Sequence, residues 1–205
     1  SDWVGSFNRG IDTVCIEILL SKGIHASISK SDKFEFYYKD QSIVSELNSE
    51  HLEKIAKSKS FFRYVAGTAF YFYKFGGLKI KITKMDLPIG KGLASSATIC
   101  ALVATAYNKF YNLGYSPDDI MRFAFLGETL TGSKCGRGDQ IGSYVGNGRV
   151  FKLVFNNENV TVTPIKIFKP FYFLIADVKG NKNTPIICND LQKARKGTRL
   201  VDSNA

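Results

Sequence analysis

The chain is poor in the residues that build metal clusters and disulfide frameworks. It contains four cysteines and two histidines among 205 residues. Cys15, Cys100, Cys135 and Cys188 are widely spaced, with no C-x-x-C pair and no paired histidines beside them. This spacing argues against a zinc site. It favours reduced thiols of the kind found in the cytosol, with Cys100 as a core residue.

Long hydrophobic runs are also missing. No apolar stretch approaches the roughly 18 residues that a membrane-spanning helix needs, and no signal peptide is visible. We therefore expect a soluble, cytoplasmic protein that has no membrane partner. The chain lacks an initiator methionine as well, and its abrupt start at Ser1 predicts a processed, trimmed or partial chain.

Acidic residues are in the minority, with 18 Asp and Glu against 28 Lys and Arg. Such an excess suits an anionic partner, for example a nucleotide, a phosphorylated metabolite or nucleic acid. The basic residues are scattered, however, and neither a block of five like charges nor the aromatic-basic pattern of an RNA-binding sheet occurs. We therefore expect no nucleic-acid partner.

Hydrophobic residues are plentiful, at 44% of the chain with 16 phenylalanines. This content predicts a globular protein with a sizeable core, and the length fits one domain, or one domain and part of another. Apolar runs or alternating patterns predict strands at residues 14–20, 24–28, 34–38 and 78–83. Alternating charges predict a solvated helix over residues 50–59.

Three further helices are predicted. Phe61, Val65, Ala69 and Phe72 share one helical face, which indicates a core helix that ends near residue 74. Small residues repeat at helical spacing from Ala97 to Asn108, which predicts a helix that begins near Ser95. Ser116, Pro117 and Asp119 are typical of a capped helix start, and this helix carries Glu128 near its end. A hairpin over 150–155 and 160–167 and a buried strand over 171–178 complete the prediction.

The predicted strand at 78–83 and the helix after it are joined by Asp86-Leu-Pro-Ile-Gly-Lys-Gly-Leu-Ala-Ser-Ser-Ala97. Gly90 and Gly92 let the backbone approach a phosphate closely, and Lys91 adds positive charge. The first N–H groups of the helix and its dipole favour an anion, and a serine hydroxyl can reach a phosphate-bound magnesium ion. The plain alternative is a Gly/Ser turn that caps the helix. The Walker pattern is absent, since Lys91 is followed by glycine.

The string Pro88-x-x-x-Gly92-Leu93-x-Ser95-Ser96-Ala97 resembles the signature phosphate loop of the GHMP kinase superfamily, which includes galactokinase, homoserine kinase, mevalonate kinase and phosphomevalonate kinase. The resemblance implies the cofactors ATP and Mg²⁺. The residues that it assigns to ATP are Pro88, Gly90, Lys91, Gly92, Leu93, Ala94, Ser95, Ser96 and Ala97.

The resemblance also implies roles for three side chains. In the family, a serine of the phosphate loop and a glutamate on a helix bind the metal, and the matching positions are Ser96 and Glu128. An aspartate in a Gly-x-x-Asp-Gln setting accepts the hydroxyl proton or positions the nucleophile, which makes Asp139 the expected catalytic residue. Arg137 either neutralises the charge of the transferred phosphate or pairs with Asp139.

The segment Cys135-Gly-Arg-Gly-Asp-Gln140 is most similar to galactokinase-like members. It implies an ATP-dependent kinase whose acceptor is a hydroxyl of a small molecule, with a sugar preferred. A mevalonate, homoserine or threonine kinase is the first alternative, and a non-catalytic nucleotide- or sugar-binding homologue is the second. The family's early acceptor motif is not recognisable, so Asp12 is only a candidate substrate contact.

The fold that the resemblance implies is α+β. A domain like the second domain of ribosomal protein S5 is expected over residues 1–167 and carries the ATP and magnesium residues. Residues 168–205 would begin a ferredoxin-like C-terminal domain, here incomplete. The family's later Gly-x-Gly-x-Gly-Gly motif is not found in the sequence, which bears on whether the chain is active alone.

Overall fold

The computed structural model describes residues 13–144, 149–156 and 159–169, together with residues 172, 186 and 190. Its strands are β1 (Thr13–Ile18), β2 (Ile24–Ser31), β3 (Phe34–Tyr38), β4 (Gln41–Ser45), β5 (Gly77–Met85), β6 (Val150–Asn156) and β7 (Asn159–Pro164). Its helices are α2 (Ser49–Ala56), α3 (Arg63–Ala69), α4 (Ser95–Tyr111) and α5 (Pro117–Leu130), with 3₁₀ turns η1 (Tyr73–Phe75) and η2 (Asp139–Tyr144). The expected mixture of helices and sheets is confirmed.

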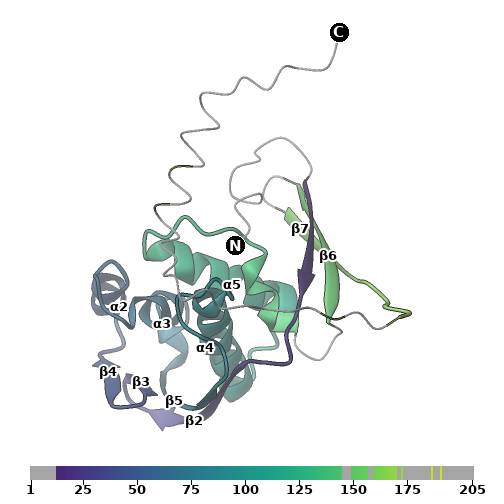
Figure 1. Ribbon diagram of the computed structural model, residues 1–205. Coiled ribbons are helices and arrows are strands. Elements are labelled where there is room, and N and C mark those ends of the chain that lie inside the picture. The colour runs from purple at the N-terminus through teal and green to yellow at the C-terminus, as the bar shows by residue number, and fades with distance from the viewer. Residues whose placement is uncertain are drawn as a thin grey trace.

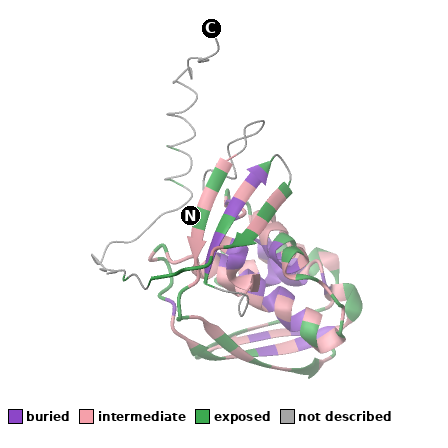
Figure 2. Ribbon diagram, turned by 90° about the vertical axis from the view of Figure 1, so that its right-hand side faces the viewer, coloured by how far each residue is buried: buried purple, intermediate pink, exposed green. Residues whose placement is uncertain are grey.

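The strands form two separate sheets with helices between them (Figures 1 and 2). The larger sheet has the order β2-β5-β3-β4, in which β3 runs parallel to β5 and the other neighbours are antiparallel. The smaller sheet has the antiparallel order β1-β6-β7. Strands from the two ends of the described chain therefore meet, since β1 pairs with β6.

The main core lies between the larger sheet and the helices. On β5, Leu78 and Ile80 are fully buried while Lys79 and Lys81 point away from the core, as the alternation predicts. The same core contains Val103, Ala104 and Tyr107 of α4. The small side chains of α4 let it pack closely, so the helix that starts at the phosphate-loop segment is held firmly against its neighbours.

A second core lies under the smaller sheet. Phe151, Leu153 and Phe155 of β6 pack with Met121 of α5 and Ile141 of η2. The backbone N–H of Ile141 donates to Gly138 O at 2.9 Å, which closes the first turn of η2. This core fixes η2, the element that begins with the predicted catalytic residue.

Helices α3 and α5 cross at a pair of glycines. A Cβ atom on Gly67 would overlap the carbonyl oxygen of Gly127, and one on Gly127 would overlap the side chain and backbone of Thr68. Only glycine permits this close approach. Because Glu128 follows Gly127 directly, the crossing helps to set the position of that carboxylate.

Several boundaries differ from the sequence prediction. The helix expected over 61–74 is broken, since α3 ends at Ala69 and η1 follows it. Phe61 is 47% exposed, so its expected place in the core was wrong, whereas Phe72 is fully buried.

Strand β4 was not predicted, because it is an edge strand with polar, exposed residues at its start. Strand β7 ends at Pro164, which has no N–H to donate, and does not reach residue 167.

The capped start of α5 is confirmed. The Ser116 side chain accepts from the Asp119 backbone N–H, and the Asp119 carboxylate accepts from the Ser116 backbone N–H. The strand predicted over 171–178 and the second domain predicted from residue 168 fall almost entirely outside the described residues. Among the described helices, none has the length and apolar content needed to span a membrane.

Candidate functional site

The segment between β5 and α4 has the backbone of a tight anion-binding loop. Gly90 and Gly92 have φ angles of 72° and 82°, and Ala94, just before α4, has a φ of 53°. This left-handed conformation is easy for glycine and unfavourable for alanine. Strain of this kind at a non-glycine residue is typical of functional sites. The left-handed conformation at Ala94 in particular suggests that residues 86–94 do more than reverse the chain direction.

The loop is anchored at its start and open along its length. The backbone N–H of Asp86 donates to Gly23 O at 3.0 Å, and its carboxylate pairs with Lys84 Nζ at 2.8 Å. Pro88, Gly90 and Gly92 are exposed. The other residues assigned to ATP are half-buried, apart from Ala97, which is buried: Lys91, Leu93, Ala94, Ser95 and Ser96.

Helix α4 begins without a side-chain cap and without an acidic residue in its first turn. The carbonyl oxygen of Ala94 accepts from both the N–H and the hydroxyl of Thr98, each at 2.9 Å. The first N–H groups of any helix lack partners within the helix, and the dipole makes this end positive. In a 17-residue helix preceded by glycines, this end suits a phosphate group.

Two of the predicted functional side chains are in direct contact. Ser96 Oγ, at the start of α4, donates to Glu128 Oε1, near the end of α5, at 2.8 Å. The two residues are 32 positions apart in the sequence. The second oxygen of the same carboxylate, Oε2, accepts from Gln140 Nε2 of η2 at 2.9 Å. Three elements therefore converge on one carboxylate at the end of the loop.

Glu128 is only 3% exposed. Burial raises the pKa of its carboxyl group, and the nearby Asp139 raises it further. Hydrogen bonds from Ser96, Gln140 and Cys135 act in the opposite direction and lower it. A buried carboxylate is costly unless its charge is matched, and a bound cation would lower that cost.

The charge of Asp139 adds to the effect of burial in raising the pKa of Glu128, and it acts on Glu17 of β1 in the same way. Asp139 is half-buried and begins η2. The guanidinium of Arg137 lies over the Phe155 ring, 5.6 Å from its centroid. Ser96 and Glu128 are thus in contact, and Asp139 directly precedes Gln140, which donates to Glu128. Asp12 lies outside the described residues.

The Ser96–Glu128 pair fits magnesium, provided that phosphates complete the coordination. In the described part of the chain, no three His, Cys, Asp or Glu side chains gather into a metal site made by protein alone. Magnesium is usually held by one or two carboxylates together with substrate phosphates and water. One carboxylate and one hydroxyl beside a phosphate-binding helix end are such a set of ligands.

An apolar cavity of about 160 Å³ opens beside the loop. Ser95 and Ser96 form its edge on the loop side. The rest of its lining is largely aromatic and aliphatic, and includes Phe36, Tyr38, Phe61, Tyr64, Ile82 and Ile99. The exposed Phe61, whose ring stacks on Tyr38 at 6.0 Å, is therefore part of a cavity wall. Such a lining suits a flat, apolar group attached to a phosphate chain.

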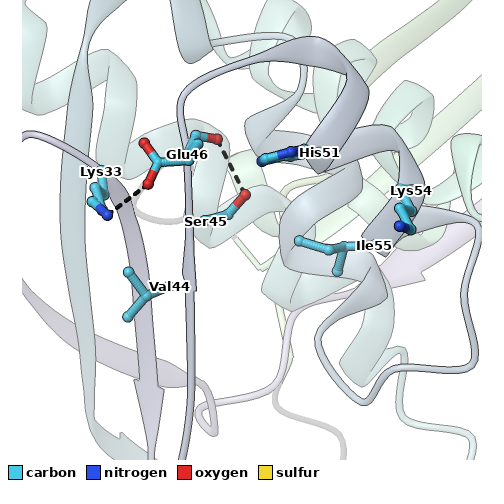
Figure 3. A pocket seen from close by; sticks show the side chains of 7 residues that line it. All are labelled: Lys33, Val44, Ser45, Glu46, His51, Lys54 and Ile55. Carbon is cyan, nitrogen blue, oxygen red and sulfur yellow. Dashed lines mark hydrogen bonds and ion pairs between the residues drawn. The ribbon is translucent and has the colours of Figure 1, made fainter.

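A second hollow, of about 310 Å³, is lined mainly by polar and charged side chains, unlike the apolar cavity beside the loop (Figure 3). It is lined by β4, α2 and Lys33, and its edge carries the exposed Lys33–Glu46 ion pair at 2.6 Å. Ser45, in the wall of this hollow, pairs with Phe34 of β3. Phe34 pairs in turn with Leu78, near the start of β5. The loop follows Met85, roughly 23 Å further along that strand at about 3.3 Å per residue. This hollow therefore lies at the opposite end of the larger sheet.

Two residues near the site had no predicted role. Gln140 was only part of the Asp-Gln motif, and Glu17 was part of an apolar strand. Cys15 Sγ donates to Glu17 Oε1 at 3.3 Å, and both side chains face the second core because they pair with Leu153 and Phe151. A charged residue in an apolar strand was the signal for Glu17. No local signal could show that Gln140 contacts Glu128.

Comparisons with known proteins agree with this geometry. The family model for the GHMP kinases N terminal domain matches residues 54–147. A galactokinase from Thermosipho africanus is 30% identical over 146 residues, which cover 68% of this chain and 40% of the relative. A homoserine kinase from Thermoplasma volcanium is 33% identical over 110 residues, 53% of this chain and 34% of that protein.

The fold is found among solved structures as well. A mevalonate kinase from Methanococcus jannaschii superimposes with a TM-score of 0.54 at 21% identity, over 78% of this chain and 57% of that one. The chain spans about 40% or less of the length of the galactokinase and the homoserine kinase. GHMP kinases transfer phosphate from ATP to hydroxyl groups. The family model ends just beyond η2 and so includes the loop, Glu128 and Asp139, and it places this part of the chain, residues 54–147, in the GHMP kinase superfamily.

Proposed function

We propose that this chain is the nucleotide-binding part of an ATP-dependent kinase that phosphorylates a hydroxyl group of a small molecule, with a sugar as the favoured acceptor. The contact between Ser96 Oγ and Glu128 Oε1 at 2.8 Å carries the proposal. It joins the start of the phosphate-loop helix to a buried carboxylate. A Gly/Ser turn that only caps a helix does not require a hydrogen bond to a buried carboxylate.

In this proposal, the β- and γ-phosphates of ATP lie over residues 90–96 and accept from the N–H groups at the start of α4. The base lies in the apolar cavity that Ser95 and Ser96 border. Ser96 and Glu128 would hold Mg²⁺, which when bound neutralises charge on the phosphates. Lys91, on the loop itself, adds positive charge on the same side.

Asp139 would orient the acceptor hydroxyl and take its proton. Its place at the start of η2, directly before the Gln140 that donates to Glu128, supports this role. Transfer of the γ-phosphoryl group in line needs no covalent intermediate on the protein. Positioning and charge neutralisation supply most of the rate in reactions of this type.

A sugar is favoured because the Cys135–Gln140 segment is galactokinase-like and galactokinases are among the relatives. Homoserine kinases also match at similar identity, which keeps an amino-acid alcohol as the alternative acceptor. A non-catalytic homologue would need neither Asp139 nor the metal pair, yet all three side chains are retained. We also propose that residues 1–167 form the ATP-binding domain and that a second domain begins at residue 168.

The test is a coupled ADP-release screen with Mg-ATP over hexoses, pentoses, heptoses, mevalonate, homoserine and threonine. We expect ADP release with one acceptor, preferably a sugar. The Asp139→Asn variant should lose about 10²–10⁴-fold in rate, which is the usual contribution of a general base. If wild type and variant released ADP equally fast with the acceptor, Asp139 would not have the proposed role. A folded protein that does not bind Mg-ATP would contradict the whole proposal.

A further inference from the structure

We propose that Gln140 is a positioning residue that holds Glu128 in the orientation needed to ligate magnesium. This inference rests on the proposed function and extends it to a residue with no assigned role. Gln140 is fully buried, and its Nε2 donates to Glu128 Oε2 at 2.9 Å.

The two oxygens of the Glu128 carboxylate have different partners. Oε1 accepts from Ser96 Oγ at 2.8 Å, and Oε2 accepts from Gln140 Nε2. Serine can exchange this hydrogen bond for a metal bond, because its oxygen has lone pairs. The amide nitrogen of glutamine only donates and cannot ligate. The Gln140 bond could therefore persist with magnesium bound, and Ser96 and Glu128 Oε1 would be left to hold the ion.

This arrangement is that of an outer-shell partner. Ligating carboxylates are commonly held by hydrogen bonds from residues that do not touch the metal, and loss of such a partner typically weakens metal affinity 10–100-fold. Because an amide N–H bonds best to an ionised carboxylate, Gln140 also favours the charged form of Glu128 that a cation requires.

The residue next to Gln140 is held by packing. The next residue, Ile141, is buried in the second core with Met121 and Phe151. A positioning group must itself be held by packing if it is to fix a ligand within a fraction of an ångström. The 3₁₀ turn η2 thus connects the second core to the carboxylate on α5.

Stability does not explain a glutamine at this position. Gln140 Oε1 is buried and has no hydrogen-bond partner among the residues that the structure describes. A buried polar atom without a partner is unfavourable, and an apolar side chain of similar shape would avoid that loss. The residue is therefore better explained by the bond that its Nε2 donates to Glu128.

The experiment measures ATP affinity by calorimetry in Mg²⁺ and again in EDTA, for wild type and for Gln140→Met, which keeps the shape but removes the amide. We expect the magnesium-dependent gain in affinity to fall 10–100-fold in the variant, with affinity in EDTA unchanged. Ser143→Ala is the matched control. Its hydroxyl lies on η2, is buried and has no partner among the described residues, so its magnesium response should equal that of wild type.

Three outcomes would overturn the inference. The first is an unchanged magnesium response in folded Gln140→Met, which leaves the proposed function intact. The second is an equal loss of affinity in Mg²⁺ and in EDTA, which would show a merely structural role. The third is a wild-type protein whose ATP affinity is the same in Mg²⁺ and in EDTA, which overturns the proposed function as well. Should Gln140→Met not fold, Gln140→Asn, whose amide is one methylene too short to reach Glu128, must show the same selective loss.

Discussion

At the scale of single residues, the proposed site is centred on one buried carboxylate, Glu128, whose charge lowers the stability of the folded chain. Glu128 is buried, and burial is the largest cause of the rise in its pKa, ahead of the hydrogen bonds that lower it. The surrounding donors reduce the cost of the buried charge without removing it. A cation bound at Ser96 and Glu128 would lower that cost further.

The raised pKa of Glu128 predicts that the free energy of unfolding depends on pH. The unfolded chain ionises this group near its ordinary value of 4.5, whereas the folded chain keeps the proton to higher pH. Between these two points the folded state binds more protons, so the stability that Glu128 contributes falls as pH rises. Urea unfolding in EDTA should therefore show a greater advantage of Glu128→Gln over wild type at pH 8 than at pH 5. An equal difference at both pH values would contradict a buried Glu128 with a raised pKa.

A pair of tyrosines on α4 allows a matched test of buried hydroxyl groups. The hydroxyl of Tyr107 is buried without a partner among the described residues, whereas that of Tyr111 donates to Gly77 O at 2.6 Å. Tyr107→Phe should keep or raise the free energy of unfolding, by up to about 1 kcal/mol, and Tyr111→Phe should lower it by about 1 kcal/mol. Chemical denaturation measures both. A larger loss for Tyr107→Phe than for Tyr111→Phe would show that the two environments are wrongly assigned.

At the scale of elements, the crossing of α3 and α5 controls where Glu128 lies. A methyl group on Gly127 would overlap Thr68 of α3. Gly127→Ala should therefore force the helices apart and cost about 1–3 kcal/mol in unfolding free energy, as overpacked cores do. The magnesium response of ATP binding should fall with it, because Glu128 moves.

Gly142→Ala is the control for this prediction. A Cβ at Gly142 meets no atom within 4 Å, and the residue is not among those with a positive φ. Thermal unfolding should leave Gly142→Ala close to wild type and lower the melting temperature of Gly127→Ala clearly. Equal melting temperatures for the two variants would show that the helices do not cross this closely.

Sequence patterns predicted the elements best where one local signal dominates. The capping box at Ser116 and the alternation around Leu78 depend on neighbours in the sequence, and both are confirmed. The edge strand β4 has weak alternation, and the break after Ala69 has no proline to mark it. These depend on tertiary contacts, which a local pattern does not contain.

At the scale of the whole molecule, the two sheets bring distant parts of the chain to the two sides of one site. The larger sheet presents the loop after β5, and the smaller sheet holds η2 through the second core. The family resemblance singles out Ser96, Glu128 and Asp139 because it is local to their segments, and the roles of these residues stay a prediction. The contact of Gln140 with Glu128 could not be predicted, since it exists only after η2 has packed against α5.

The most direct test of the proposed site is the affinity of the chain for ATP in the presence and absence of Mg²⁺, measured by calorimetry on wild type and on Ser96→Ala. If the loop and Glu128 bind Mg-ATP, magnesium should tighten binding to wild type. Ser96→Ala, folded as judged by its melting curve, should lose at least about tenfold of that gain. A folded wild type that binds no ATP, or an alanine variant with the full magnesium response, would contradict the site as described.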